Sequence, residues 1–130
     1  MKKSILIVED DELLADVFAK SLKEQGFKVR VAKNYIEAMK KFEPSRTALV
    51  VLDIILKGKN RFELLRDFRK EPGGDQVPVV IVTGMNTQEL NMDKDLRVSL
   101  NIIGIHTKSQ FSISQFTGII KNYLSRYETK

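Results

Sequence analysis

Five polar side chains stand directly behind apolar runs, where a buried strand would end. They are Glu9 and Asp10 after ILIV, Asp53 after VVL, Thr83 after VIV and Lys108 after IHT. Burying an ionised carboxylate costs several kcal/mol unless a cation or hydrogen bonds compensate it, so Asp53 is expected at the mouth of a strand. The carboxyl ends of parallel strands meet at one edge of a sheet, where the ligand crevice lies. We therefore expect the five groups to form one site.

The residue types of this site suit phosphoryl transfer. Three carboxylates make an oxygen-rich pocket for Mg²⁺, which binds one or two carboxylates together with phosphate oxygens and keeps several waters. The metal and the Lys108 ammonium would neutralise phosphoryl charge, the Thr83 hydroxyl would donate to a phosphoryl oxygen, and Asp53 would be the nucleophile that forms an acyl phosphate. Each residue alone has an ordinary structural explanation, such as helix capping; the five together favour a site.

The elements that must position these groups are read from alternating apolar and amphipathic runs, which predict five β-α units. The predicted strands span residues 4–8, 27–32, 48–53, 77–84 and 101–108. Gly26 ends the first helix, Asn34 caps the second before Pro44 stops it, and the last helix carries an apolar stripe from Phe116 to Tyr127. Between strands four and five, the apolar residues from Asn86 to Leu100 fit no helical face well, although a helix is expected there.

Length and composition indicate one domain over residues 1–130, because 42% apolar content is enough for one core. The chain has no cysteine and a single histidine, His106, which excludes disulfides, thiolate metal sites and a cysteine nucleophile. Its first apolar run is too short for a signal peptide, and no run approaches the ~20 residues of a membrane span. We expect a cytoplasmic protein without a membrane partner.

The net charge of +5 comes from 22 basic and 17 acidic residues, which are dispersed except in the basic segment from Lys57 to Lys70. A nucleic-acid binder would add a recognition helix, a zinc finger or exposed aromatics between the charges, and none is present in the sequence. The basic segment is better explained as a solvated helix face or a surface for an acidic partner. A nucleic-acid partner is not expected.

The acidic pair in ILIVEDDE, the aspartate in VVLDI, the threonine in VIVTG and the lysine in HTK together carry a family resemblance. Over its full length the chain resembles the receiver domain of response regulators in two-component signalling. The resemblance implies a flavodoxin-like, doubly wound α/β fold, in which a five-stranded parallel sheet of order 2-1-3-4-5 is flanked by five helices.

The resemblance also implies a role for each site residue. Asp53 corresponds to the phospho-acceptor, Thr83 to the phosphoryl-binding hydroxyl and Lys108 to the base that pairs with the phosphate. The Mg²⁺ ligands would be Asp10 and Asp53 directly, Glu9 through water, and the backbone carbonyl of Ile55. Asp11, just past the acidic pair, is expected to cap the following helix instead.

Three departures from the family pattern concern the loop after Asp53 and the end of the last strand. Lys57 and Arg61 replace a proline and a glycine that many receivers carry. The switch position, usually aromatic, is Ile105, so the usual threonine-aromatic coupling cannot operate, and neighbouring His106 is expected to be a weak substitute. Ser109 replaces the proline that usually follows the lysine; a cis bond there would cost ~2.5–4 kcal/mol, so we expect trans, which could redirect the ammonium.

Two functions remain open at this stage. The first is a working single-domain receiver that takes a phosphoryl group from a sensor histidine kinase or histidine phosphotransfer protein in a phosphorelay and signals by contact with a downstream protein. It would catalyse its own phosphorylation and, because Ile55 and Met85 are apolar and cannot orient water, slow dephosphorylation, without being a turnover enzyme. The second is a degenerate receiver that binds proteins independently of phosphorylation. A Mg²⁺-dependent phosphatase fits less well, since it needs Asp-x-Asp and the acids here are adjacent.

Overall fold

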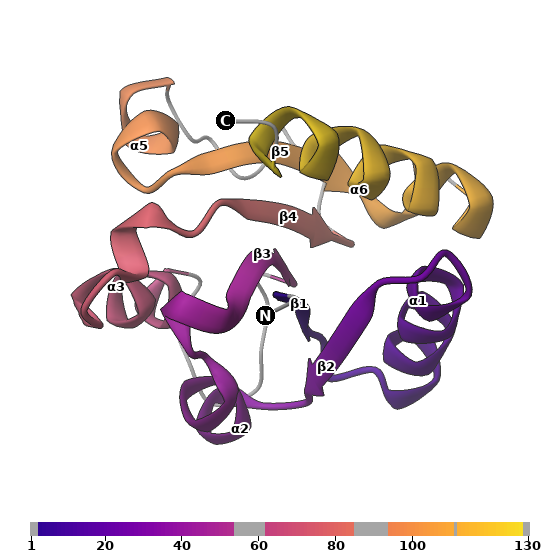
Figure 1. Cartoon of the computed structure of the whole chain (residues 1–130), viewed down its shortest axis with the longest axis horizontal. Coiled ribbons are helices and arrows are strands. Elements are labelled where there is room, and N and C mark those ends of the chain that lie inside the picture. Colours follow the sequence, from indigo (N-terminus) through magenta and orange to yellow (C-terminus); the bar gives the residue numbers. More distant parts are fainter. Residues whose placement is uncertain (1–2, 54–61, 85–93, 111, 129–130) are drawn as a thin grey trace.

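The computed structural model describes residues 3–53, 62–84, 94–110 and 112–128. Its parallel sheet has five strands in the order β2-β1-β3-β4-β5, as predicted (Figure 1). The strands are β1 Ser4–Val8, β2 Lys28–Ala32, β3 Thr47–Leu52, β4 Val79–Thr83 and β5 Ile102–Thr107. Within the described residues five α-helices surround it: α1 Glu12–Glu24, α2 Tyr35–Lys41, α3 Glu63–Lys70, α5 Lys94–Ser99 and α6 Ile113–Glu128.

Strand residues alternate between two apolar layers, one on each face of the sheet. Ile5 and Ile7 of β1 pack with residues of α1 and α6, whereas Leu6 and Val8 pack with residues of α2 and α3. Stacked phenyl rings mark both layers: the centroids of Phe18 and Phe116, like those of Phe42 and Phe68, lie 4.1 Å apart. Strands buried on both faces explain the continuous apolar runs of the sequence.

The helix ends follow the predicted signals. Asp11 caps α1 by accepting a hydrogen bond from the Leu14 N–H, and Asn34 caps α2 by accepting from the Glu37 N–H. Gly26 follows α1 with a φ of 91°, a left-handed conformation that glycine adopts without steric cost. These caps start both helices immediately beyond the carboxyl ends of β1 and β2.

The boundaries differ from the predicted ones by a residue or two. Strand β3 ends at Leu52, so Asp53 lies just outside it, and β5 ends at Thr107, so Lys108 begins a short 3-10 helix, Lys108–Gln110. Of the helix expected between Asn86 and Leu100, the structure shows α5, Lys94–Ser99; residues 85–93 lie outside the described residues.

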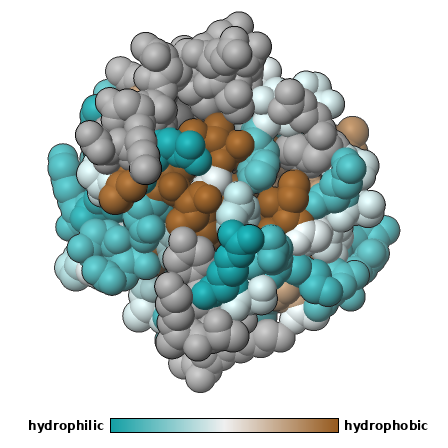
Figure 2. Space-filling model, turned by 90° about the horizontal axis from the view of Figure 1, so that it is seen from above, coloured by the Kyte–Doolittle hydropathy of each residue, from teal (hydrophilic) through white to brown (hydrophobic). Residues whose placement is uncertain are grey.

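The molecular face above β5 and α6 mixes apolar and hydrophilic residues, as Figure 2 shows. One large apolar side chain of α5, Val98, is 72% exposed. None of the helices in the described part of the chain has the length and apolar character needed to cross a bilayer.

Candidate functional site

Strand register brings the acidic residues to one edge of the sheet. Val8 pairs with Leu52, and the Asp53 N–H donates to the Val8 carbonyl at 2.9 Å, so Glu9 and Asp53 emerge side by side. Glu9 and Asp53 are buried, at 2% and 6% exposure, and Asp10 is half-buried. The sheet thus places three acids in one pocket, as the sequence indicated.

Thr83 and Lys108 reach the same edge from β4 and β5. Thr83 is the last residue of β4 and is fully buried. It pairs in register with Thr107, the residue before Lys108. The Lys108 ammonium crosses the strand ends and lies 2.8 Å from Asp53 Oδ2 and 2.6 Å from Glu9 Oε1. All five predicted side chains therefore lie at one edge of the sheet.

The peptide bond between Lys108 and Ser109 does not withdraw this ammonium. The described residues contain no cis peptide bond, in agreement with the expectation for Ser109. The 3-10 helix that begins at Lys108 still leaves its ammonium within hydrogen-bond distance of Asp53. A proline after the lysine is thus not required for this contact.

Burial governs the electrostatics of the pocket. Desolvation raises the pKa of Glu9 from 4.5 to about 7, helped by the Asp53 charge and opposed by the hydrogen bond from Lys108. For Lys108, burial acts to lower the pKa, but its hydrogen bonds to Asp53 and Glu9 outweigh burial and raise it. The Lys108 ammonium therefore stays charged, and its charge compensates the buried Asp53 carboxylate.

The acidic cluster has the chemistry of a magnesium site. One carboxylate oxygen from each of Glu9, Asp10 and Asp53 lies within 4.8 Å of the others. Oxygen donors of this kind suit a hard cation that retains several waters. The residues present therefore fit Mg²⁺. The expected carbonyl ligand, Ile55, lies outside the described residues, as do Lys57, Arg61 and Met85.

The residues around the switch position face opposite sides of β5. Ile105 is half-buried and packs against the apolar layer that contains α2 and α3 residues. His106 instead lies 2.9 Å from the Tyr123 hydroxyl of α6, and burial lowers its pKa from 6.5. His106 is thus turned towards α6, so it does not occupy the place of a switch aromatic.

One role was missed by sequence reasoning. Glu9 forms a direct ion pair with Lys108, which the sequence did not predict. Its expected role as a water-mediated metal partner stays a prediction. Glu9 and Lys108 follow β1 and β5, which are separated in the sheet by β3 and β4. No local sequence signal reports a contact across three strand spacings; only the strand order together with the length of a lysine side chain could have suggested it.

The sequence matches the family of response regulator receiver domains over residues 5–103. The chain therefore belongs to this family, and the strand order and acidic pocket agree with that assignment. The match ends before Lys108, so the position of this lysine in the pocket rests on the structure itself.

Relatives of known description include regulatory proteins longer than this chain. The sensory transduction protein RegX3 of Mycolicibacterium smegmatis is 32% identical over 95% of this chain and 51% of its own length. The regulatory protein VanRB of Enterococcus faecalis is 35% identical over 68% of this chain and 39% of its own length. The chain thus spans about half or less of these relatives.

Solved receiver structures have the same fold. A CheY-like response regulator receiver domain protein from Methanospirillum hungatei superposes with a TM-score of 0.80 at 25% identity, covering 99% of this chain and 98% of that one. The non-phosphorylated HemR receiver domain from Leptospira biflexa gives 0.77 at 28% identity, covering 95% of both chains.

Proposed function

We propose that Asp53 accepts a phosphoryl group from a phosphohistidine on a sensor histidine kinase or histidine phosphotransfer protein. The phosphorylated domain then signals in the cytoplasm by contact with a downstream protein. The observation that carries this proposal is the contact of 2.8 Å between the Lys108 ammonium and Asp53 Oδ2, beside a cluster of three carboxylates. A half-buried lysine beside three clustered acids favours phosphoryl transfer over a role in binding alone.

The proposed reaction is a displacement at phosphorus. A carboxylate oxygen of Asp53 forms a bond to phosphorus while the bond to the histidine nitrogen breaks, and the bonding electron pair stays on that imidazole nitrogen. The Lys108 ammonium offsets charge on the phosphoryl oxygens, and the Thr83 hydroxyl donates to one of them. The product is an acyl phosphate on Asp53 and a free histidine on the donor.

The acidic cluster would hold Mg²⁺ during this reaction. Asp10 and Asp53 would bind it directly and Glu9 through water, with the Ile55 carbonyl as a further ligand. When bound, the ion supplies positive charge next to the phosphoryl oxygens. Asp10 and Glu9 would therefore position the cation. The Lys108 ammonium supplies a second positive charge beside Asp53.

The test is to incubate the purified protein with acetyl phosphate and Mg²⁺ and to measure its intact mass. We expect one added phosphoryl group, and none in Asp53→Asn, because the nucleophile is lost. Asp75→Asn, which changes an exposed aspartate in the turn before β4, is the matched control and should be phosphorylated like the wild type. If no adduct forms at millimolar donor, the proposal is wrong and phosphorylation-independent binding takes its place.

A further inference from the structure

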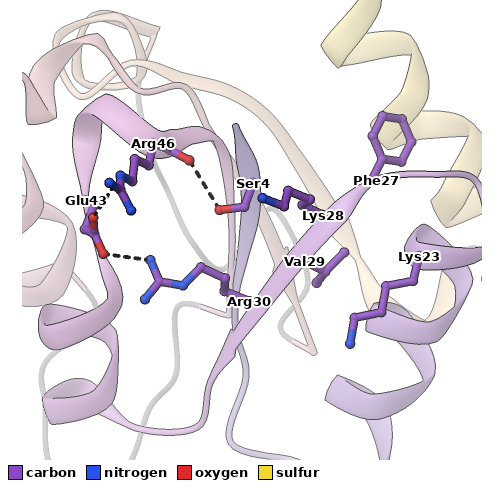
Figure 3. Close-up of a pocket in the computed structure, with 8 residues that line it drawn as sticks. All are labelled: Ser4, Lys23, Phe27, Lys28, Val29, Arg30, Glu43 and Arg46. Atoms are coloured by element: carbon purple, nitrogen blue, oxygen red, sulfur yellow. Dashed lines mark hydrogen bonds and ion pairs between the residues drawn. The ribbon is translucent and has the colours of Figure 1, made fainter. Parts of the chain in front are cut away.

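A second concave site lies at the end of the sheet opposite Asp53. It is a hollow of about 510 Å³ beside Ser4 and Lys28, the first residues of β1 and β2, whereas the phosphorylation site follows the last residues of its strands. Figure 3 shows the side chains that line it. The volume lies within the usual range of ligand sites. We call it the cationic hollow.

Positive charge dominates the cationic hollow. Four cations line it, Lys23, Lys28, Arg30 and Arg46, against one carboxylate, Glu43. Glu43 is shared, because Arg30 Nη1 lies 3.2 Å from its Oε1 and Arg46 Nε lies 3.6 Å from its Oε2. Lys23 and Lys28 are exposed. One shared carboxylate cannot balance four cations, so the local potential attracts anions.

The cations are spread around the hollow and do not converge on one point. Figure 3 shows Arg30 and Arg46 with Glu43 on one side, Lys23 on the other and Lys28 between them. Arg30 is also held by a hydrogen bond from its Nη1 to the Lys41 carbonyl at 2.8 Å. A compact phosphate is usually bound by converging donors. Separated cations instead match carboxylates spaced along an extended chain.

The strand beside the hollow can accommodate such a chain. β2 is the terminal strand of the sheet, with β1 as its sheet neighbour among the described residues. The Lys41 ammonium donates to the Val31 carbonyl of this strand, so the part of the edge with which an extended peptide can pair lies at the start of β2, beside Val29. Val29 adds a half-buried apolar contact, while the one aromatic ring that lines the hollow, Phe27, packs against the core layer of α1 and α6 residues. Stacking of nucleic-acid bases on an open aromatic face is therefore not supported here.

From charge complementarity and the unpaired strand edge at the start of β2, we infer that the cationic hollow binds an extended acidic segment of a partner protein. This is an interaction surface separate from the phosphorylation site. It requires no phosphoryl group on Asp53, so the domain could contact a second protein from the end of the sheet remote from its site.

The test uses a fluorescent octapeptide of alternating glutamate and valine, titrated with the full chain and followed by anisotropy. We expect saturable binding that weakens as salt rises, because exposed charges are screened. The double variant Lys23→Glu, Lys28→Glu should bind about tenfold more weakly, since two attractive contacts become repulsive. Asp53→Asn should bind the peptide unchanged, which separates this inference from the proposed phosphorylation.

The matched control is Lys40→Glu, Lys70→Glu, which makes the same change in net charge at exposed lysines outside the hollow. It should retain peptide binding. Equal weakening in both double variants would show attraction to overall charge and would overturn the inference. No peptide binding at low salt would also overturn it, as would preferential binding of a single-stranded oligonucleotide that is lost in Lys23→Glu, Lys28→Glu.

Discussion

Replacing Lys108 by methionine tests whether the ammonium stabilises the buried acids. Removing one partner of a buried ion pair costs about 3–5 kcal/mol, because the remaining charge is left uncompensated. Here the Asp53 carboxylate loses its cation, as does Glu9 in its ionised form, which is only part of the population at neutral pH because the pKa of Glu9 is raised to about 7. The Lys108 side chain is 23% exposed, so water screens part of the interaction. We expect the free energy of unfolding to fall by about 2–3 kcal/mol at neutral pH.

Urea unfolding at neutral pH measures this loss as a shift of the midpoint with an unchanged slope. Lys20→Met is the matched control, since Lys20 is an exposed lysine of α1, and its effect should stay within about 0.5 kcal/mol. Lys108→Met should also slow phosphorylation by acetyl phosphate. A stability loss no larger than that of Lys20→Met would refute the reasoning, because it would mean that the ammonium does not compensate the buried carboxylates.

Three further outcomes are expected. Mg²⁺ should raise the melting temperature of the wild type, and Asp10→Asn should remove most of that rise; an unchanged response would contradict the ligand assignment. Burial lowers the pKa of His106, so the unfolded chain takes up a proton first as the pH drops below 6.5. This contribution lowers the free energy of unfolding as the pH falls, against the opposite contribution of Glu9, whose raised pKa of about 7 stabilises the folded state on acidification. The free energy of unfolding should therefore change less favourably over that range in the wild type than in His106→Gln; identical pH profiles of the two proteins would contradict this role of His106. The acyl phosphate should decay slowly, and faster in an Ile55→Asn, Met85→Glu double variant once the donor is removed; equal decay rates measured by intact mass would show that these apolar side chains do not limit the attack of water.

Much of the fold could be predicted because its signals are local. Continuous apolar runs such as Ser4 to Val8 indicate strands buried on both faces, and Asp11 and Asn34 show the side chains that start helices. The meeting of the site residues followed from one topological rule about strand ends. The strand order itself came from the family resemblance, since periodicity does not say which strands are neighbours.

What sequence could not supply depends on distances between side chains. The ion pair of Glu9 with Lys108 joins non-adjacent strands, and the direction of the His106 ring depends on the packing of α6 against β5. The cationic hollow has the same origin, because Lys23 and Arg46 belong to different elements and meet only through the fold. Patterns within one segment carry no information about such contacts.

The contact of Lys108 with Asp53 makes the acidic site depend on how β5 and α6 are held against the rest of the sheet. β5 stands at the edge of the sheet, furthest in strand order from β2, and Lys108, directly after it, supplies a cation that contacts both Glu9 and Asp53. Native proteins open in units smaller than the whole fold. If β5 and α6 detach while β1 and β3 stay paired, the acids remain together without their lysine and repel one another. The ammonium that compensates Asp53 is therefore held in place by the docking of β5 and α6, and partial opening there would remove it from the acidic cluster before β1 and β3 separate.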